Sequence, residues 1–276
     1  MRYFFDSKRI ANSTWQQFER DTARYLMFRG FSDVRIIGGS GDKGADILGV
    51  LNGKQWVIQC KHYQRSRLSK KVIEEVFNAY QYYKADRIAI SASQKLGPQL
   101  KDEIQRYEQK YFPLKIGVFG PGLLTNDDTF KAYPNGQKIL RPYQRRVVES
   151  FSDALTQVGI GQVIMATGLG KTVVMAETVA SLINSLDIKN ILVLAHTTPL
   201  VNQLHQSFWS QISKWVPTQQ MSDGEKPNSF EGITFALIQS IVNKLETLPQ
   251  FDLILVDEAH HIGSRSYLKT LARLSP

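Results

Sequence analysis

The sequence predicts an α/β protein of two units, each made of a β-sheet flanked by helices. Short apolar strands alternate with amphipathic helices along most of the 276 residues. In the first half, a hairpin signal at Asn52-Gly53 precedes alternating helices and strands, which indicates a mixed sheet. In the second half, over residues 161–172, an apolar stretch leads through a glycine-punctuated turn into a helix. A turn-rich segment, residues 120–136, separates the two halves.

The composition is that of an ordinary globular protein and excludes several classes. Apolar residues make up 42% of the chain and charged residues 21%. No apolar run approaches the roughly 20 residues that cross a membrane, and the first residues lack the apolar core of a signal peptide. Cys60 is the one cysteine, which excludes an internal disulfide and a cysteine-based zinc site. We therefore expect a cytoplasmic protein with no membrane partner.

Positive charge is concentrated in the first half of the chain. Residues 1–125 hold 21 lysines and arginines against 12 acidic residues, whereas residues 126–276 hold 13 of each. A basic half beside a neutral half favours a partner with a phosphate backbone. A solvated basic surface would give the same charge balance, and that alternative stays open at this point.

The first half is expected to begin with a helix over residues 14–29, capped by Ser13 or Thr14. Glu19 lies beside the apolar face of this helix, at the edge of the core. A glycine-rich turn over residues 38–44 is expected to precede the hairpin. The further elements expected are strands over residues 33–37, 45–50, 54–61, 86–92 and 114–119, and helices over residues 69–84 and 100–111.

The hairpin is expected to gather three polar side chains. Asp46 stands at the start of the strand that leads into the Asn52-Gly53 turn, and the returning strand alternates apolar and polar positions. Gln59 and Lys61 therefore point to one face of the sheet. Because the two strands pair, we expect Asp46 beside them.

These side chains suit metal-dependent chemistry on a phosphodiester. Asp46 and the Gln59 region, including the backbone carbonyl of Cys60, offer hard oxygen ligands for Mg²⁺, or for Mn²⁺ in its place. Such an ion lowers the pKa of a bound water and neutralises charge on the phosphate. Lys61 would orient the nucleophile or stabilise the oxyanion, and Glu19 would complete the ligand shell. Three solvated strand residues are the alternative, because Asp, Gln and Lys are common on surfaces.

The same residues carry a resemblance to a known family. Phe18-Glu19, then GSGDKGAD, then twelve residues and Gln59-Cys60-Lys61, resemble the Mrr-type restriction endonucleases of the PD-(D/E)xK superfamily. The resemblance covers residues 10–120 and implies a restriction-endonuclease-like mixed sheet flanked by helices, which cleaves double-stranded DNA with a divalent metal. It implies catalytic roles for Asp46, Gln59 and Lys61, with Glu19 in support. In this family Gln replaces the usual second acidic residue.

Residues 161–172 read GQVIMATGLGKT and carry a phosphate-binding pattern. An apolar strand over residues 163–165 is expected to lead into a turn whose backbone N–H groups face a triphosphate. Lys171 would reach the β- and γ-phosphates, and the Thr172 hydroxyl would hold Mg²⁺. Met165 stands where the strict pattern has glycine. The residues expected to contact the nucleotide are Thr167, Gly168, Leu169, Gly170, Lys171 and Thr172.

Residues 251–261 read FDLILVDEAHH, an apolar strand that ends in two carboxylates. Asp257 would meet the Mg²⁺ that Thr172 holds, and Glu258 would polarise an attacking water. Taken alone, a buried strand followed by a solvated acidic turn is the alternative.

Together with LRPYQ upstream, these motifs resemble the first RecA-like lobe of superfamily 2 helicases, closest to the restriction-enzyme and DNA-translocase branches. The resemblance implies a parallel-sheet P-loop lobe that binds ATP, with Arg141, Tyr143 and Gln144 at the adenine. It also implies contacts to nucleic acid from the segments that follow two expected strands, over residues 190–195 and 233–238.

The expected organisation is an Mrr-like endonuclease domain over residues 1–125, a linker over 126–137 and an incomplete first helicase lobe over 138–276. We expect an N-terminal fragment of a larger protein, with weak or no ATP hydrolysis of its own. The expected function is a Mg²⁺-dependent DNA endonuclease coupled to an ATP-driven translocase, of the restriction or phage-defence type. A DNA-remodelling helicase whose first domain binds DNA without cutting is the alternative, and an RNA helicase is a weaker one. A homodimer and further restriction-system subunits are both open as partners.

Overall fold

The computed structural model describes residues 3–37, 43–63, 70–258, 260 and 262–274. Two segments singled out in the sequence, residues 38–44 and 251–261, therefore lie partly outside the described residues. Of the glycine-rich turn expected over residues 38–44, the structure describes only Lys43 and Gly44. Of the stretch over residues 251–261, it leaves out Ala259 and His261.

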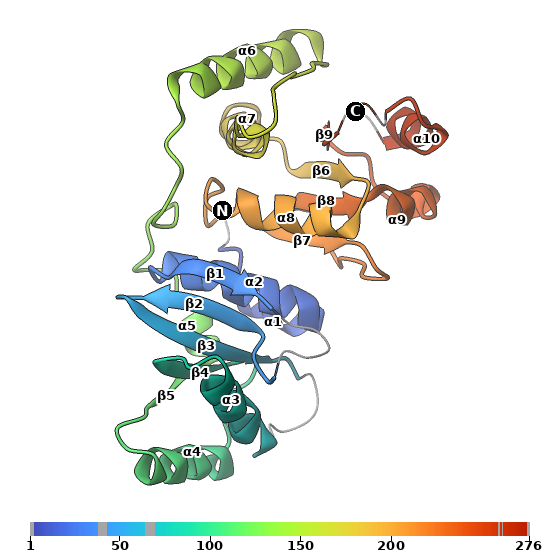
Figure 1. The fold of residues 1–276 in the computed structure, drawn as a ribbon. Coiled ribbons are helices and arrows are strands. Elements are labelled where there is room, and N and C mark those ends of the chain that lie inside the picture. Colours follow the sequence, from blue (N-terminus) through green and yellow to red (C-terminus); the bar gives the residue numbers. More distant parts are fainter. Residues whose placement is uncertain (1–2, 38–42, 64–69, 259, 261, 275–276) are drawn as a thin grey trace. The chain divides into compact units, whose positions relative to one another are not determined.

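The chain divides between Lys131 and Ala132 into two units, and each unit has its own sheet (Figure 1). Within the part of the chain that the structure describes, no helix has the length and apolar character that crossing a membrane requires. The two units are described separately below.

The first unit is built on a mixed sheet with the strand order β1-β2-β3-β4-β5. Its elements are α1 (Ser7–Asn12), α2 (Trp15–Phe28), β1 (Ser32–Ile36), β2 (Ile47–Leu51), β3 (Lys54–Lys61), α3 (Lys71–Tyr82), β4 (Arg87–Ala92), α4 (Pro98–Lys110), β5 (Ile116–Phe119) and α5 (Pro121–Leu124). The first three strands pair antiparallel, whereas β3, β4 and β5 pair parallel. This arrangement confirms the mixed sheet expected from the sequence.

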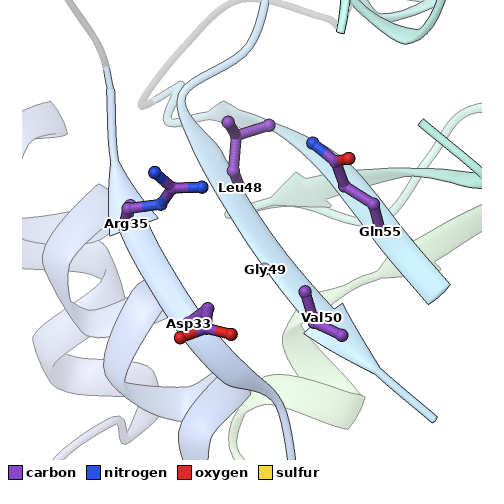
Figure 2. A pocket seen from close by; sticks show the side chains of 6 residues that line it. All are labelled: Asp33, Arg35, Leu48, Gly49, Val50 and Gln55. Carbon is purple, nitrogen blue, oxygen red and sulfur yellow. The ribbon is translucent and has the colours of Figure 1, made fainter. Parts of the chain in front are cut away.

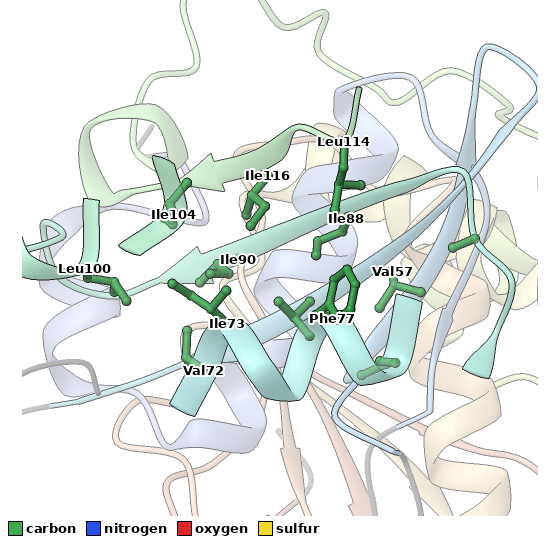
Figure 3. Close-up of a cluster of buried hydrophobic side chains, with 14 of the residues drawn as sticks. Val57, Val72, Ile73, Phe77, Ile88, Ile90, Leu100, Ile104, Leu114 and Ile116 are labelled. Atoms are coloured by element: carbon green, nitrogen blue, oxygen red, sulfur yellow. The ribbon is translucent and has the colours of Figure 1, made fainter. Parts of the chain in front are cut away.

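Helices cover both faces of this sheet. α2 begins after the N-cap Thr14, whose hydroxyl accepts a hydrogen bond from Gln17 N at 3.1 Å. α2 lies on the face to which Ser91 points, because the hydroxyls of Thr22 and Ser91 are 3.1 Å apart. α3 and α4 pack on the opposite face, where their apolar side chains meet those of the central strands (Figure 3). This core cluster includes Val57, Val72, Ile73, Val76, Ile88, Leu100, Ile104 and Ile116.

The β2–β3 hairpin turns at Asn52 and Gly53, whose φ angles of 52° and 70° are the left-handed values of a tight two-residue turn. Ile47 pairs with Ile58 across the hairpin, which places the residue before β2 next to the end of β3. Alternation along β3 puts Val57 into the core cluster under α3, so every second residue after it faces the same way.

The second unit holds a sheet in which each pair of neighbouring strands is parallel, in the order β7-β8-β6-β9. Its elements are α6 (Pro142–Val158), α7 (Lys171–Leu186), β6 (Asn190–Ala195), α8 (Thr198–Phe208), β7 (Thr218–Met221), β8 (Gly232–Leu237), α9 (Ile238–Val242), the 3₁₀ turn η1 (Leu245–Thr247), β9 (Leu253–Val256) and α10 (Arg265–Leu274). The two central strands, β6 and β8, are almost wholly buried. The parallel sheet expected for this half is confirmed.

One expected element of this unit is wrong. The stretch over residues 163–165 is not a strand, and residues 160–166 have no regular secondary structure. Ile164 is 87% exposed. A strand requires a hydrogen-bonded neighbour, and each of the described strands in this sheet pairs only with other strands of the order above. The apolar run is present in the sequence, but the described residues give it no strand to pair with, so an irregular segment leads into the phosphate loop.

Candidate functional sites

Asp46 is buried directly before β2 and is held by the strands on either side. Its backbone N–H donates to Ile58 O at 3.0 Å, and its carbonyl accepts from Ile37 N at 2.8 Å. Its Oδ2 accepts hydrogen bonds from Gln59 Nε2 at 2.5 Å and from Cys60 N at 2.6 Å. The structure therefore brings the Asp46 carboxylate, the Gln59 amide and the main chain of Cys60 together, while their metal-binding and catalytic roles stay predictions.

The second amide atom of Gln59 offers a test of whether a metal fits here. Oε1 of Gln59 is buried and has no hydrogen-bond partner in the described part of the chain. A buried acceptor left in this state costs roughly 1–3 kcal/mol. A hard cation would satisfy it, because carboxylate and amide oxygens are the ligands that Mg²⁺ takes in proteins. Asp46 and Gln59 together therefore fit a divalent metal.

The Asp46–Gln59 pair differs from the usual clusters of metal-binding side chains. Among the described residues, no group of three or more His, Cys, Asp or Glu side chains is arranged to hold a metal ion. The pair at the hairpin contains one carboxylate and one amide, and its predicted third ligand is the backbone carbonyl of Cys60. Such a set of oxygen ligands suits Mg²⁺ rather than a metal that prefers nitrogen or sulfur.

Lys61, at the end of β3, contacts a carboxylate that the sequence did not predict to be part of the site. Its Nζ lies 2.7 Å from Oε2 of Glu75 on α3. The signal that could have found Glu75 is its place on the helix that covers the Gln59–Lys61 face of the sheet. It stands next to Val76, which is fully buried in the core cluster.

Glu19 lies on the other side of the sheet from Gln59 and Lys61. It belongs to α2 and is partly buried. Burial raises the pKa of the Cys60 thiol well above its usual value, and the charges of Asp46 and Glu19 raise it further. Glu19 is thus close enough to β3 for its charge to act there, but on the α2 face. Its role as a metal ligand stays a prediction.

An open pocket lies farther along the same strands. It is lined by Asp33, Arg35, Leu48, Gly49, Val50 and Gln55 (Figure 2). Leu48 follows Asp46 by two residues and therefore shares its face of the sheet. The pocket therefore opens on the same face of the sheet as Asp46, and Arg35 contributes a cation to its lining.

In the second unit, the phosphate-loop residues bend as the motif requires. Gly168 and Gly170 have φ angles of 82° and 85°, which favour glycine. Gly170 is the N-cap of α7, and no side chain caps this helix end. Lys171 and Thr172 form its first turn. An uncapped helix N-terminus that follows a glycine-rich turn is suited to bind a phosphate.

Tyr143 and Gln144, which were expected to contact adenine, bind the loop itself. Tyr143 donates its hydroxyl hydrogen to Leu169 O at 3.0 Å, and Gln144 Nε2 donates to the same oxygen at 2.9 Å. Gln144 Oε1 accepts from Arg141 N at 2.9 Å. A Cβ at Gly170 would overlap the Gln144 amide. The adenine contact stays a prediction, and forming it would require Gln144 to exchange these partners.

Asp257 and Glu258 follow β9 at the edge where the neighbouring strands also end. Burial raises the pKa of Asp257 and the adjacent Glu258 raises it further, whereas the charge of Lys171 lowers it. Asp257 therefore lies within electrostatic reach of the first residue of α7. Glu258 has a left-handed φ of 59°, and its Oε2 lies 3.1 Å from His260 Nδ1. The contact predicted between Thr172 and Asp257 through a metal stays a prediction.

The segments expected to contact nucleic acid leave the sheet at this same edge. β6 and β8 are parallel neighbours, and Ala195 pairs with Leu237 at their carboxyl ends. Thr197 caps α8 by accepting from Leu200 N at 3.4 Å. Loops that follow neighbouring parallel strands lie side by side, which is the usual place for a ligand in such sheets.

Comparison with known families identifies both halves. Residues 137–275, half of the chain, match the family model described as Type III restriction enzyme, res subunit. This chain belongs to that family. Residues 10–111 match a second family model, Mrr_cat, described as restriction endonuclease. No curated protein matches the sequence.

Two solved structures are similar to this restriction-enzyme chain. One is described as "ATP-dependent Type ISP restriction-modification enzyme LlaBIII bound to DNA"; it is 20% identical, with a TM-score of 0.41. The match covers 92% of this chain and 19% of that one. The other is the UvsW helicase from bacteriophage T4, 16% identical, with a TM-score of 0.40. That match covers 63% of this chain and 64% of the helicase, so this chain spans less than two thirds of either protein.

The family matches confirm the two resemblances found in the sequence. A restriction endonuclease domain of the Mrr type is joined to a helicase-like domain in one chain. Two features of the sites were missed by sequence reasoning. One is Glu75, which contacts Lys61, and the other is the Leu169 carbonyl, which takes the Gln144 amide. Both are contacts between segments distant along the chain.

Proposed function

We propose that the first unit cleaves double-stranded DNA as a Mg²⁺-dependent endonuclease, and that the second binds ATP as part of a DNA translocase. The whole would serve DNA restriction or phage defence. The observation that carries the proposal is the buried Asp46–Gln59 pair, in which Gln59 Oε1 is left without a partner in the described residues. The match of residues 10–111 to a restriction endonuclease family supports it. The excess of basic over acidic residues within residues 1–125 supports a phosphate-backbone substrate.

The residues of the hairpin would share the work of phosphodiester hydrolysis. Asp46, Gln59 and the backbone carbonyl of Cys60 would hold Mg²⁺, with Glu19 in support. When bound, the ion supplies a water of lowered pKa and positive charge for the phosphate. The water oxygen forms a bond to phosphorus, one P–O ester bond breaks, and the departing oxygen takes up a proton. Lys61 would place its ammonium against the negative charge that develops on the phosphoryl oxygens.

The second unit would bind ATP through the loop before α7. The glycines of the loop and the helix N-terminus would cradle the phosphates, and Lys171 would reach the terminal ones. Thr172 and Asp257 would hold the Mg²⁺ that accompanies ATP, and Glu258 would orient an attacking water. Tyr143 and Gln144 support this role by holding the loop through the Leu169 carbonyl. Coupling of ATP hydrolysis to movement along DNA is proposed for the whole protein.

The proposal is tested by incubating supercoiled plasmid with the chain and Mg²⁺ or Mn²⁺, on both modified and unmodified DNA. Nicking or linearisation is expected from the unsubstituted chain and not from Asp46→Ala or Lys61→Ala. Asp102→Ala and Lys101→Ala serve as matched controls, because both residues are exposed on α4. DNA binding by all five proteins is measured in parallel. Equal binding with no cleavage by any of them would overturn the nuclease proposal and favour a non-cleaving DNA-binding module.

A further inference from the structure

The ion pair between Lys61 and Glu75 differs from an ordinary surface pair. Nζ and Oε2 lie 2.7 Å apart; the Lys61 side chain is 19% exposed and the Glu75 side chain is 44% exposed. In the Lys115–Glu108 pair of the same unit, the two atoms are 2.9 Å apart, the lysine is 72% exposed and the glutamate is 18% exposed. Water screens a partly buried pair much less than an exposed one. In this pair the lysine is the more buried partner, so its stem and ammonium are confined more than those of an exposed lysine.

Glu75 also touches the other side of the site, through its main chain. Gly44 has a φ of 87°, and a Cβ at this position would overlap the Glu75 carbonyl oxygen. Gly44 stands two residues before Asp46, so the segment that enters the site rests on the backbone of Glu75. The next residue of α3, Val76, is fully buried and fixes this turn of the helix in the core. One residue thus contacts the chain on both sides of the hairpin site.

We propose that Glu75 is a positioning residue of the endonuclease site, which holds the Lys61 ammonium where the scissile phosphate binds beside Asp46. The inference rests on the proposed nuclease function. A lysine has a long flexible stem, and without a fixed partner its ammonium samples many places. Catalysis by a charged group depends on a prearranged position, since a misplacement of about 1 Å costs on the order of 100-fold in rate. Glu75 would supply that arrangement from the rigid helix that covers this face of the sheet.

The cleavage test compares Glu75→Gln, Glu75→Asp and the control Glu74→Gln in the full chain, with Mg²⁺. Glu74 precedes Glu75 on α3 and is exposed. Glu75→Gln is expected to lower kcat by about 10- to 100-fold with KM for DNA unchanged. Glu75→Asp, which keeps the charge, is expected to recover part of the loss, and Glu74→Gln to cleave normally. If Glu75 only stabilised the fold, Glu75→Gln would impair DNA binding and cleavage together, and Glu75→Asp would not recover kcat.

A second readout needs neither metal nor cleavage. Lysines are converted to dimethyl-lysine with ¹³C-labelled methyl groups, which keeps their charge, and the Lys61 signal is assigned by its loss in Lys61→Arg. We expect Glu75→Gln to move this NMR signal and Glu74→Gln to leave it in place. An unmoved Lys61 signal in Glu75→Gln, or equal kcat in Glu75→Gln and Glu74→Gln, overturns the positioning role of Glu75 and leaves the nuclease function standing. If the unsubstituted chain shows no metal-dependent cleavage, the nuclease function is overturned, and the positioning role of Glu75 with it.

Discussion

The substitution Gln59→Glu gives the sharpest test of the hairpin site. It exchanges the amide that donates to Asp46 Oδ2 at 2.5 Å for a second carboxylate. At that separation two unit charges repel by about 7 kcal/mol for an effective dielectric constant of about 20. The folded chain avoids this repulsion by binding one proton between the two groups, because a protonated carboxyl donates to Asp46 as the amide did.

The cost of that proton sets the magnitude of the expected effect. Protonating a glutamate with an ordinary pKa of about 4.3 costs about 4 kcal/mol at pH 7 and about 2 kcal/mol at pH 6. The pKa of the new carboxyl is raised in the folded state, so its protonated form favours folding and the loss of stability grows as the pH rises. Mg²⁺ should reduce the loss, since two carboxylates bind a divalent ion better than one.

Cys60 supplies the assay, because it lies on β3 next to the substituted residue. It is the one cysteine of the chain, it is buried, and burial raises the pKa of its thiol. A maleimide should therefore label it only when β3 opens. Labelling is followed over a urea series at pH 6 and pH 7, with EDTA and with Mg²⁺. Gln55→Glu, on the same strand and face but partly exposed, is the matched control. A loss of stability in Gln59→Glu that is no greater than the loss in Gln55→Glu, or that does not change with pH, would refute the geometry of the Asp46–Gln59 pair.

Three further predictions concern the loops of the two sites. Gly44→Ala should lower the free energy of unfolding in urea by about 1–3 kcal/mol more than Gly53→Ala, because both residues have a left-handed φ but only the Gly44 substitution overlaps backbone atoms. Equal costs would show that the Gly44 segment does not rest on α3. Gln144→Ala should weaken binding of a fluorescent ATP analogue by about 2- to 10-fold, since the phosphate loop loses one hydrogen bond. Lys171→Ala should weaken it further, by at least about 10-fold, through loss of a charged phosphate contact; a smaller effect than that of Gln144→Ala would argue against the loop as the phosphate site.

Elements specified by neighbouring residues could be predicted from the sequence. β3 begins and ends at the predicted residues, because the Asn52-Gly53 turn fixes one end and the alternation of side chains fixes its faces. α2 begins after Thr14, one of the two residues predicted as its cap, for a similar reason, since the capping hydrogen bond joins residues only three apart. The approach of Gln59 to Asp46 follows from the same turn, which sets the pairing of β2 with β3.

Features that depend on distant segments could not be predicted in this way. The apolar run over residues 163–165 satisfies a strand pattern, but a strand exists only where another strand accepts its hydrogen bonds. The Gln144 amide has many partners available, and its choice of Leu169 O depends on how α6 meets the loop. Glu75 reaches Lys61 only because α3 packs on one particular face of the sheet. In each case the sequence specifies the group and the tertiary fold specifies its partner.

Cys60 has two separate environments in one residue. Its N–H donates to the Asp46 carboxylate inside the hairpin site, whereas its thiol is buried toward α2, where the Thr22 side chain is a hydrogen-bonding neighbour. The main-chain contact is open to any amino acid except proline, since every other residue carries an N–H. The side chain at position 60 is therefore constrained only by packing against α2, and any residue other than proline would keep the backbone N–H that donates to Asp46.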